Sequence, residues 1–270
     1  MLDKLPPDGN RAWRGFPWTF FLAVFAVSLP FWLLGELTTT QLMPGLPVSA
    51  LMFLCPAFIA CLFALRTGGR HVVKKLLVRS FDCRRIGSVI YLVTAVLLMP
   101  GILVGSYAIM QTMGMPMPQP EVPWSLTPVL FLLFFVAAVG EEMAWTATVL
   151  DPLQSRVSAL PAALIIGVVC ALWHVVPFAQ AHPSASWVLG QCLFTVALRV
   201  ILVWLYNNSG RSVFVVAVCH AMYNVAWQLL PNRGSSYNPW IVAAITGCVA
   251  LIISLAWISN LPSRPRRDGL

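Results

Sequence analysis

The chain has 270 residues, of which 59% are hydrophobic and only 10% are charged, and its mean hydropathy is +0.81. Soluble globular domains carry roughly 25% charged residues, so this composition excludes a soluble globular protein. The formal net charge of +8 comes mainly from basic residues that lie between long apolar runs. That distribution is typical of membrane topology signals, and we expect no nucleic-acid partner.

Eight apolar runs follow one another along the chain, and each is close to the roughly 20 residues that a membrane-spanning helix needs. They are Phe16–Leu37, Val48–Leu65, Ile86–Met110, Thr127–Leu150, Ser158–Phe178, Ser186–Tyr206, Ser212–Leu230 and Pro239–Ile258. None shows the period-2 alternation of a barrel strand. The sequence therefore predicts an all-α, polytopic membrane helical bundle of about eight transmembrane helices, which forms a single transmembrane domain over residues 1–270.

The basic residues between the runs predict the orientation. With a cytoplasmic N-terminus, one side of the membrane holds Lys4, Arg11, Arg14, Arg66, Arg70, Lys74, Lys75, Arg79, Arg84, Arg85, Arg156, Arg211, Arg264, Arg266 and Arg267. The opposite side holds only Arg233. Because cytoplasmic loops are enriched in Lys and Arg, both termini are expected in the cytoplasm, and a bacterial plasma membrane is the expected location.

The basic segment 66–85 is the longest cytoplasmic loop between spans. Val72, Val73, Leu76 and Leu77 fall at helical spacing among its basic residues. We therefore expect a short helix that lies in the headgroup layer and contacts membrane lipids.

Polar side chains at membrane depth gather in the second half of the chain. Placing an ionised side chain at mid-helix costs roughly 2.5 to 3.5 kcal/mol, so each one needs a reason. They are Glu141 and Glu142 in the fourth run, His174 in the fifth, Arg199 in the sixth, and His220 with Asn224 in the seventh. Four helices that each contribute such groups predict a functional site.

The spacing of these groups indicates hydrolytic chemistry. Adjacent residues on a helix point about 100° apart, so Glu141 and Glu142 are expected to face different neighbouring helices. A Glu beside a His can hold and deprotonate a water molecule. His220 and Asn224 are four residues apart on one helix face, and their N–H groups predict an oxyanion site.

Three short motifs carry a resemblance to a known family. They are EEMAWT at 141–146, LWH at 172–174 and HAMYN at 220–224. The chain resembles the CAAX prenyl protease type II and bacteriocin self-immunity (CPBP, Abi) family of intramembrane metalloprotease-like proteins, whose pattern is Glu-Glu-x-x-x-Arg, then a motif that opens with an aromatic and ends in His, then His-x-x-x-Asn. The resemblance covers about Phe131 to Gln228.

The resemblance implies a glutamate-type intramembrane endopeptidase that needs no cofactor, with its catalytic half at about 127–230. Glu141 and His174 would position and activate the hydrolytic water, and Glu142 would orient or tune the site. His220 and Asn224 would stabilise the oxyanion. The substrate would be a membrane-associated or lipidated peptide or protein, since the best-known members remove a C-terminal tripeptide from prenylated proteins on the cytoplasmic side.

Two positions depart from the family pattern. Thr146 stands where the family has Arg, and Cys170 stands where it has an aromatic residue. Losing the Arg removes the cation that would keep a neighbouring carboxylate ionised at low dielectric. We hypothesise that Arg199 supplies that charge from the next helix but one; the alternative is an arginine that snorkels to the membrane surface.

Three other functions use the same residues. A divalent metal could be held by Glu141, His174 and His220, which are adequate ligands for zinc or iron. A catalytically silent member could act as a membrane scaffold or bacteriocin immunity protein, which Thr146 favours. A proton-coupled transporter would use buried Glu and His as relays, but it predicts inverted repeats, and the sequence has none.

Overall fold

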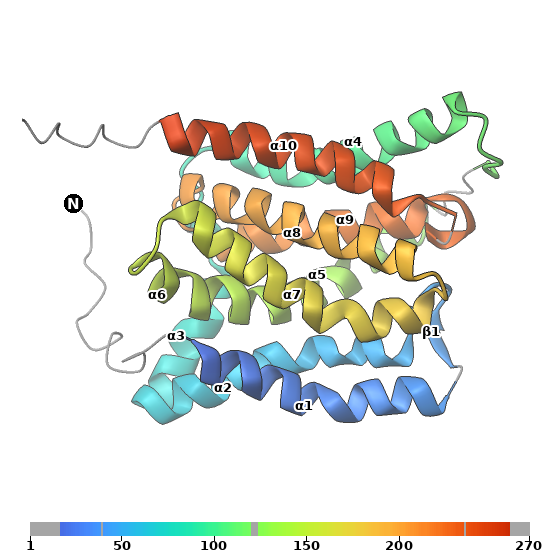
Figure 1. Cartoon of the computed structure of the whole chain (residues 1–270). Helices are drawn as coiled ribbons and strands as arrows, with labels where there is room; N and C mark the ends of the chain where they lie inside the picture. The colour runs from blue at the N-terminus through green and yellow to red at the C-terminus, as the bar shows by residue number, and fades with distance from the viewer. Residues whose placement is uncertain (1–16, 39, 120–123, 235, 260–270) are drawn as a thin grey trace, which may run out of the picture.

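The computed structural model describes residues 17–38, 40–119, 124–234 and 236–259, and within this part of the chain it is an all-α bundle of long apolar helices (Figure 1). Seven helical segments are long and apolar enough to cross a membrane, and Val213–Leu229 is a further apolar helix of 17 residues. Each of the eight predicted spans therefore corresponds to a helical segment. The fold is that of a polytopic membrane protein, as predicted.

The main helices are α1 (Trp18–Leu37), α2 (Leu54–Gly68), α3 (Arg70–Phe81), α4 (Val89–Thr112), α5 (Thr127–Ala144), α7 (Ala159–Ala181), α8 (Ala185–Asn208), α9 (Val213–Leu229) and α10 (Pro239–Ser259). Serine side chains cap three of them, because Ser88, Ser184 and Ser212 accept hydrogen bonds from backbone N–H groups of the first turns of α4, α8 and α9. Gly69 separates α2 from α3 at φ +74°, a conformation that glycine adopts readily.

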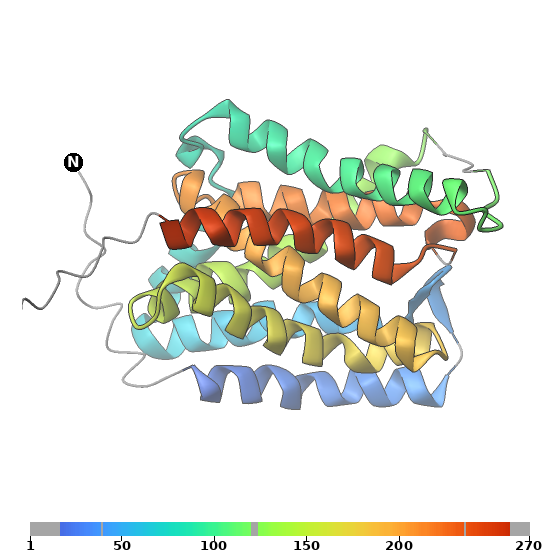
Figure 2. The same cartoon turned by 45° about the horizontal axis from the view of Figure 1, so that its top comes forward.

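The two ends of the bundle differ in structure and charge. At the basic end lie α3, the 3-10 turn η3 (Cys83–Arg85) and the short α6 (Asp151–Gln154), whereas a β-hairpin of β1 (Gln41–Met43) and β2 (Leu46–Pro47) lies at the hairpin end (Figures 1 and 2). The hairpin leads into a 3-10 helix, η2 (Val48–Phe53), where the sequence predicted the start of a regular span. The turn η5 (Pro231–Gly234) also lies at the hairpin end, between α9 and α10.

The fourth predicted span is not one regular helix. After α5, residues Trp145–Leu150 form a π-helix (η4), and α6 follows it. Single π-turns inside α-helices are frequent at functional sites. This one begins at Trp145, three residues after Glu142, and so changes the register between Glu142 and the basic end of the bundle.

The predicted surface helix of segment 66–85 is α3, and it is docked on the bundle. Arg79 of α3 donates to the Ala147 carbonyl at 3.1 Å and to the Asp151 carboxylate at 2.7 Å, and it also contacts the Tyr206 hydroxyl. Leu76 and Ser80 are buried, whereas Leu77 is exposed. The helix therefore buries one face on protein and leaves another for the surroundings. The predicted basic residues Lys4, Arg11, Arg14, Arg264, Arg266 and Arg267 lie outside the described residues.

Candidate active site

Glu142 is the centre of a buried ion pair. It lies near the end of α5, is fully buried, and accepts two hydrogen bonds from the Arg199 guanidinium, at 2.7 Å to Oε2 and 3.1 Å to Oε1. Arg199, on α8, is itself 4% exposed. Arg199 therefore does not snorkel to the membrane surface. Its guanidinium forms an ion pair with the Glu142 carboxylate instead.

Two further donors complete the surroundings of Glu142. His220 Nδ1 donates to Oε1 at 2.9 Å, and the Thr146 hydroxyl donates to Oε2. An ionised carboxylate has about four lone-pair positions, and Glu142 here accepts four hydrogen bonds. It is thus a fixed, saturated anion that holds Arg199, His220 and Thr146 in place.

The hydrogen bonds of the two histidines leave the same ring nitrogen available in each. His174 Nδ1 lies 2.8 Å from the Cys170 carbonyl, which can only accept, so this nitrogen carries the hydrogen. His220 Nδ1 donates to Glu142 in the same way. Nε2 is therefore the free nitrogen of both rings. The His174 ring is also stacked on Phe178, with ring centroids 5.2 Å apart and planes at 21°.

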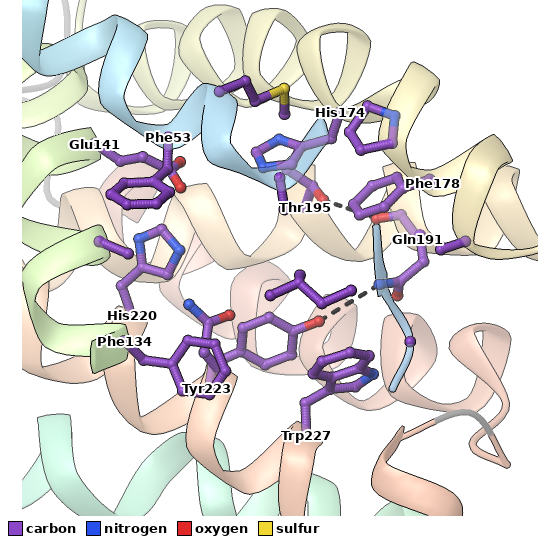
Figure 3. A pocket seen from close by; sticks show the side chains of 18 of the residues that line it. Phe53, Phe134, Glu141, His174, Phe178, Gln191, Thr195, His220, Tyr223 and Trp227 are labelled. Atoms are coloured by element: carbon purple, nitrogen blue, oxygen red, sulfur yellow. Dashed lines mark hydrogen bonds between the residues drawn. The ribbon is translucent and has the colours of Figure 1, made fainter. Parts of the chain in front are cut away.

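Glu141 has surroundings unlike those of its neighbour. It is 7% exposed, lines the cavity, and interacts electrostatically with His174 and His220. Figure 3 shows its carboxylate on the cavity wall with the His174 and His220 rings on adjoining walls. The contacts found within the described residues give it no hydrogen-bond donor. Of the two adjacent acids, Glu141 is the one with lone pairs free for a ligand.

All these groups meet in one cavity of about 330 Å³. Glu141, His174, Arg199, His220 and Asn224 line it, so α5, α7, α8 and α9 all contribute polar groups. His174, which sequence position places nearer the outer end of its helix than Glu141, reaches the same space. Glu142 and Thr146 lie behind this wall, where they hold Arg199 and His220.

The rest of the wall was not predicted. Aromatic side chains form much of it, together with two polar residues of α8: Phe53, Phe134, Phe178, Tyr223, Trp227, Gln191 and Thr195 (Figure 3). Gln191 and Thr195 precede Arg199 by eight and four residues, so this spacing could have shown that all three share one face of the helix. The residues that the β-hairpin contributes to the cavity wall show no such spacing in the sequence.

Within the described residues, no three His, Cys, Asp or Glu side chains form a group that could hold a metal ion. Glu141, His174 and His220 share the cavity without forming such a group.

The fold defines an integral membrane protein, and two comparisons show which proteins it resembles. Residues 123–226 match the family model described as type II CAAX prenyl endopeptidase Rce1-like. The chain is also similar to CAAX prenyl protease 2 of Methanococcus maripaludis, with 23% identity over 231 residues that cover 79% of this chain and 84% of that protein. Residues 123–226 are therefore similar to the Rce1-like type II CAAX prenyl endopeptidases, and the resemblance indicated by the three motifs is confirmed.

Proposed function

We propose that the chain is a glutamate-type intramembrane endopeptidase that hydrolyses a peptide bond of a membrane-associated or lipidated substrate. The observation that carries this proposal is the division between two adjacent acids. Glu142 is saturated by four donors, whereas Glu141 faces the cavity with free lone pairs. The family match and the name of the Methanococcus maripaludis relative support a CAAX-type protease.

In the proposed reaction, Glu141 and the Nε2 of His174 hold one water molecule between them. Glu141 takes a proton from this water while the water oxygen attacks the substrate carbonyl carbon. The C–N bond then breaks, and Glu141 returns the proton to the leaving amine nitrogen. Water is consumed and two peptides are released.

His220 and Asn224 would stabilise the oxyanion that forms during the attack. Because Nδ1 of His220 already donates to Glu142, a donor at Nε2 requires the imidazolium form. With His220 and Arg199 charged and both glutamates ionised, the four groups sum to zero charge. Such pairing is what a buried site needs.

The protein is proposed to use no metal, to lie in a bacterial plasma membrane with both termini in the cytoplasm, and to bind membrane lipids and a membrane peptide or protein. The metal alternative predicts that a strong chelator abolishes cleavage. Metal-free hydrolysis predicts that cleavage persists in the chelator.

The central test compares Glu141→Gln with wild type. The purified protein in liposomes is given a quenched fluorescent peptide that ends in a farnesylated CAAX box, and products are identified by mass spectrometry. Losing the general base should lower kcat/KM by about 10² to 10⁴. The matched control is Glu36→Gln, an exposed glutamate at the end of α1 outside the cavity, which should cleave normally.

A wild-type rate retained by Glu141→Gln would contradict the proposal. The scaffold alternative is tested with the same variant in cells. If Glu141→Gln leaves the phenotype of a deletion strain fully complemented, the chain acts as a scaffold or immunity protein.

A further inference from the structure

The cavity occupies only one half of the bundle. Its lining comes from residues 133–141 of α5, 170–181 of α7, 187–199 of α8 and 220–227 of α9, and in each case these lie from mid-span toward the hairpin end. The hairpin itself adds Leu42, Met43, Gly45, Leu46 and Pro47. The space thus runs from the acid and imidazole groups in mid-bundle toward the β-hairpin.

Toward the basic end the bundle is closed. Beyond the Glu142–Arg199 pair, Ala144, Trp145 and Leu150 are fully buried, and none of them lines the cavity. Trp145 contacts Trp173 edge to face, with centroids 5.8 Å apart. A substrate that approached from the basic end would meet close-packed protein.

The charges of the two ends assign them to the two sides of a membrane. The described basic end carries Arg66, Arg70, Lys74, Lys75, Arg79, Arg84, Arg156 and Arg211, whereas Arg233 is the one cation at the described hairpin end. Lys and Arg are enriched on the cytoplasmic side. The hairpin end is therefore the extracytoplasmic end.

We infer that the substrate reaches the site from the extracytoplasmic side, past the β-hairpin, as an extended apolar peptide segment. This inference rests on the proposed hydrolase function and names its substrate class. It differs from the cytoplasmic access implied by the family resemblance. The substrate would be an exported or outward-facing membrane peptide.

The wall chemistry fits an extended peptide. Most of the lining is aromatic or aliphatic, but Gln191, Thr195 and Arg199 form a polar stripe at four-residue spacing along α8. Gln191 is 3% exposed, its amide Nε2 lies 3.5 Å from the Tyr223 hydroxyl, and its Oε1 has no partner in the described structure. This oxygen is also buried, so a rotation of the Gln191 amide toward the cavity would let it accept a hydrogen bond from a main-chain N–H of the substrate.

The stripe also sets a distance. Eight residues separate Gln191 from Arg199, which is about 12 Å along a helix. An extended peptide covers that length in about three or four residues. We therefore expect Gln191 to hold the substrate main chain three or four residues to the outer side of the cleaved bond.

The first experiment tests the side of access without using catalysis. Cells that produce the Leu42→Cys protein are treated with a membrane-impermeant maleimide, as intact cells and as inside-out vesicles, and labelled peptides are quantified by mass spectrometry. Leu42 is an exposed hairpin residue, and the native Cys83 is an exposed thiol at the basic end. Labelling of the hairpin cysteine in intact cells, with Cys83 labelled only in vesicles, supports the inference. The reverse pattern overturns it.

The second experiment tests access itself in proteoliposomes. A polyethylene-glycol maleimide on Leu42→Cys should lower the cleavage rate of the quenched peptide about tenfold or more, whereas the same reagent on Cys83 alone should not. Gln191→Leu should raise KM about tenfold with kcat kept, because it removes a contact present before and during the reaction. Gln111→Leu, an exposed glutamine of α4, is the matched control.

These outcomes separate the two proposals. If Glu141→Gln retains cleavage but the hairpin is labelled from outside, the hydrolase mechanism is wrong and the outward cavity stands. Access from outside is wrong, and the hydrolase stands, if Glu141→Gln is inactive but the maleimide labels the hairpin only from the cytoplasm. The same conclusion follows if the polyethylene-glycol maleimide on Leu42→Cys leaves the cleavage rate unchanged.

Discussion

Arg199 supplies, from another helix, the charge that Thr146 lacks. In the family pattern an Arg four residues after Glu142 shares its helix face, but here Thr146 fills that position and donates only a hydroxyl hydrogen. The guanidinium comes instead from α8 and bonds both carboxylate oxygens. This geometry is bidentate, which lysine cannot reproduce.

Arg199→Gln should be strongly destabilising. It leaves Glu142 buried and fully charged with only His220 and Thr146 as donors, and breaking a buried pair in this way costs about 3 to 5 kcal/mol. A thermal unfolding series in detergent should show a large fall in melting temperature, together with lost cleavage. Arg66→Gln, an exposed arginine at the end of α2, is the control and should melt like wild type. Equal melting of both variants would show that the pair contributes little.

At the scale of helices, the contact between α7 and α8 determines where Arg199 lies. Gly167 of α7 faces α8 so closely that a Cβ on it would lie 3.1 Å from Val196 Cα and 3.2 Å from Arg199 Cβ. The small residue lets the two helices approach directly beside the ion pair. Close packing of this kind is typical of membrane helices.

Gly167→Ala should therefore push α8 away and displace Arg199. Overpacking costs about 1 to 3 kcal/mol, and we expect a lower melting temperature and reduced cleavage. Gly101→Ala on α4 is the matched control, because a Cβ there meets nothing within 4 Å. An intact melting temperature and rate for Gly167→Ala would show that α8 adjusts without moving Arg199.

A second polar cluster fastens α3 to the bundle at the basic end. Asp151 accepts from Arg79 at 2.7 Å and from the Tyr206 hydroxyl at 2.9 Å, and Arg211 lies 3.6 Å away. Arg79 also reaches the Ala147 carbonyl inside the π-helix. The cluster links the surface helix to the irregular turn that follows Glu142.

Asp151→Asn should loosen this link. Removing the charge leaves Arg79 with a weaker acceptor, at an expected cost of about 1 to 3 kcal/mol. Limited trypsin digestion should then cut at Lys74 or Lys75 sooner than in wild type. Glu36→Gln removes a carboxylate charge at the opposite end and should leave the digestion unchanged. Unaltered cleavage of α3 in Asp151→Asn would show that other contacts hold this helix.

For the whole molecule, exposed apolar side chains form an extensive surface that suits contact with lipid. Large examples on three helices are Leu22, Leu29 and Leu33 of α1, Leu97 and Val104 of α4, and Leu251 and Leu255 of α10. An apolar surface this extensive is rare on monomeric soluble proteins. The protein should therefore stay in the membrane pellet after alkaline carbonate washing and be released only by detergent. Recovery in the carbonate supernatant would contradict this.

The helices of the fold were predictable because apolar length alone marks a membrane span. The ends of the helices were less predictable. The third span was expected to begin at Ile86, but Ser88 caps α4 and the helix begins at Val89. The β-hairpin and η2 were missed because both segments are short and their polar and apolar residues do not alternate with a recognisable period. The π-helix was missed because its sequence has the same hydrophobic character as the helix around it.

The residues of the candidate site were also largely predictable, since a charged or amide group inside a span needs a reason to be there. Their partners were only partly predictable, because Arg199 was expected to supply a charge to a carboxylate, whereas His220 and Thr146 were not expected to donate to Glu142. The sequence shows that Glu141 and Glu142 point in different directions, and it favours Glu142 as the partner of Arg199, but it does not show the geometry of that pair. That depends on the Gly167 contact and on the path of α8, which come from packing between helices.

The π-helix determines how two fixed points of one span are turned relative to each other. A π-turn holds more residues than a regular helical turn, so it rotates Asp151 about the helix axis relative to Glu142. Glu142 is tied to α8 and α9, and Asp151 is tied to α3, so both ends of the irregular turn are held in place. A substitution that restored a regular helix here would turn one of these two acids away from its partners.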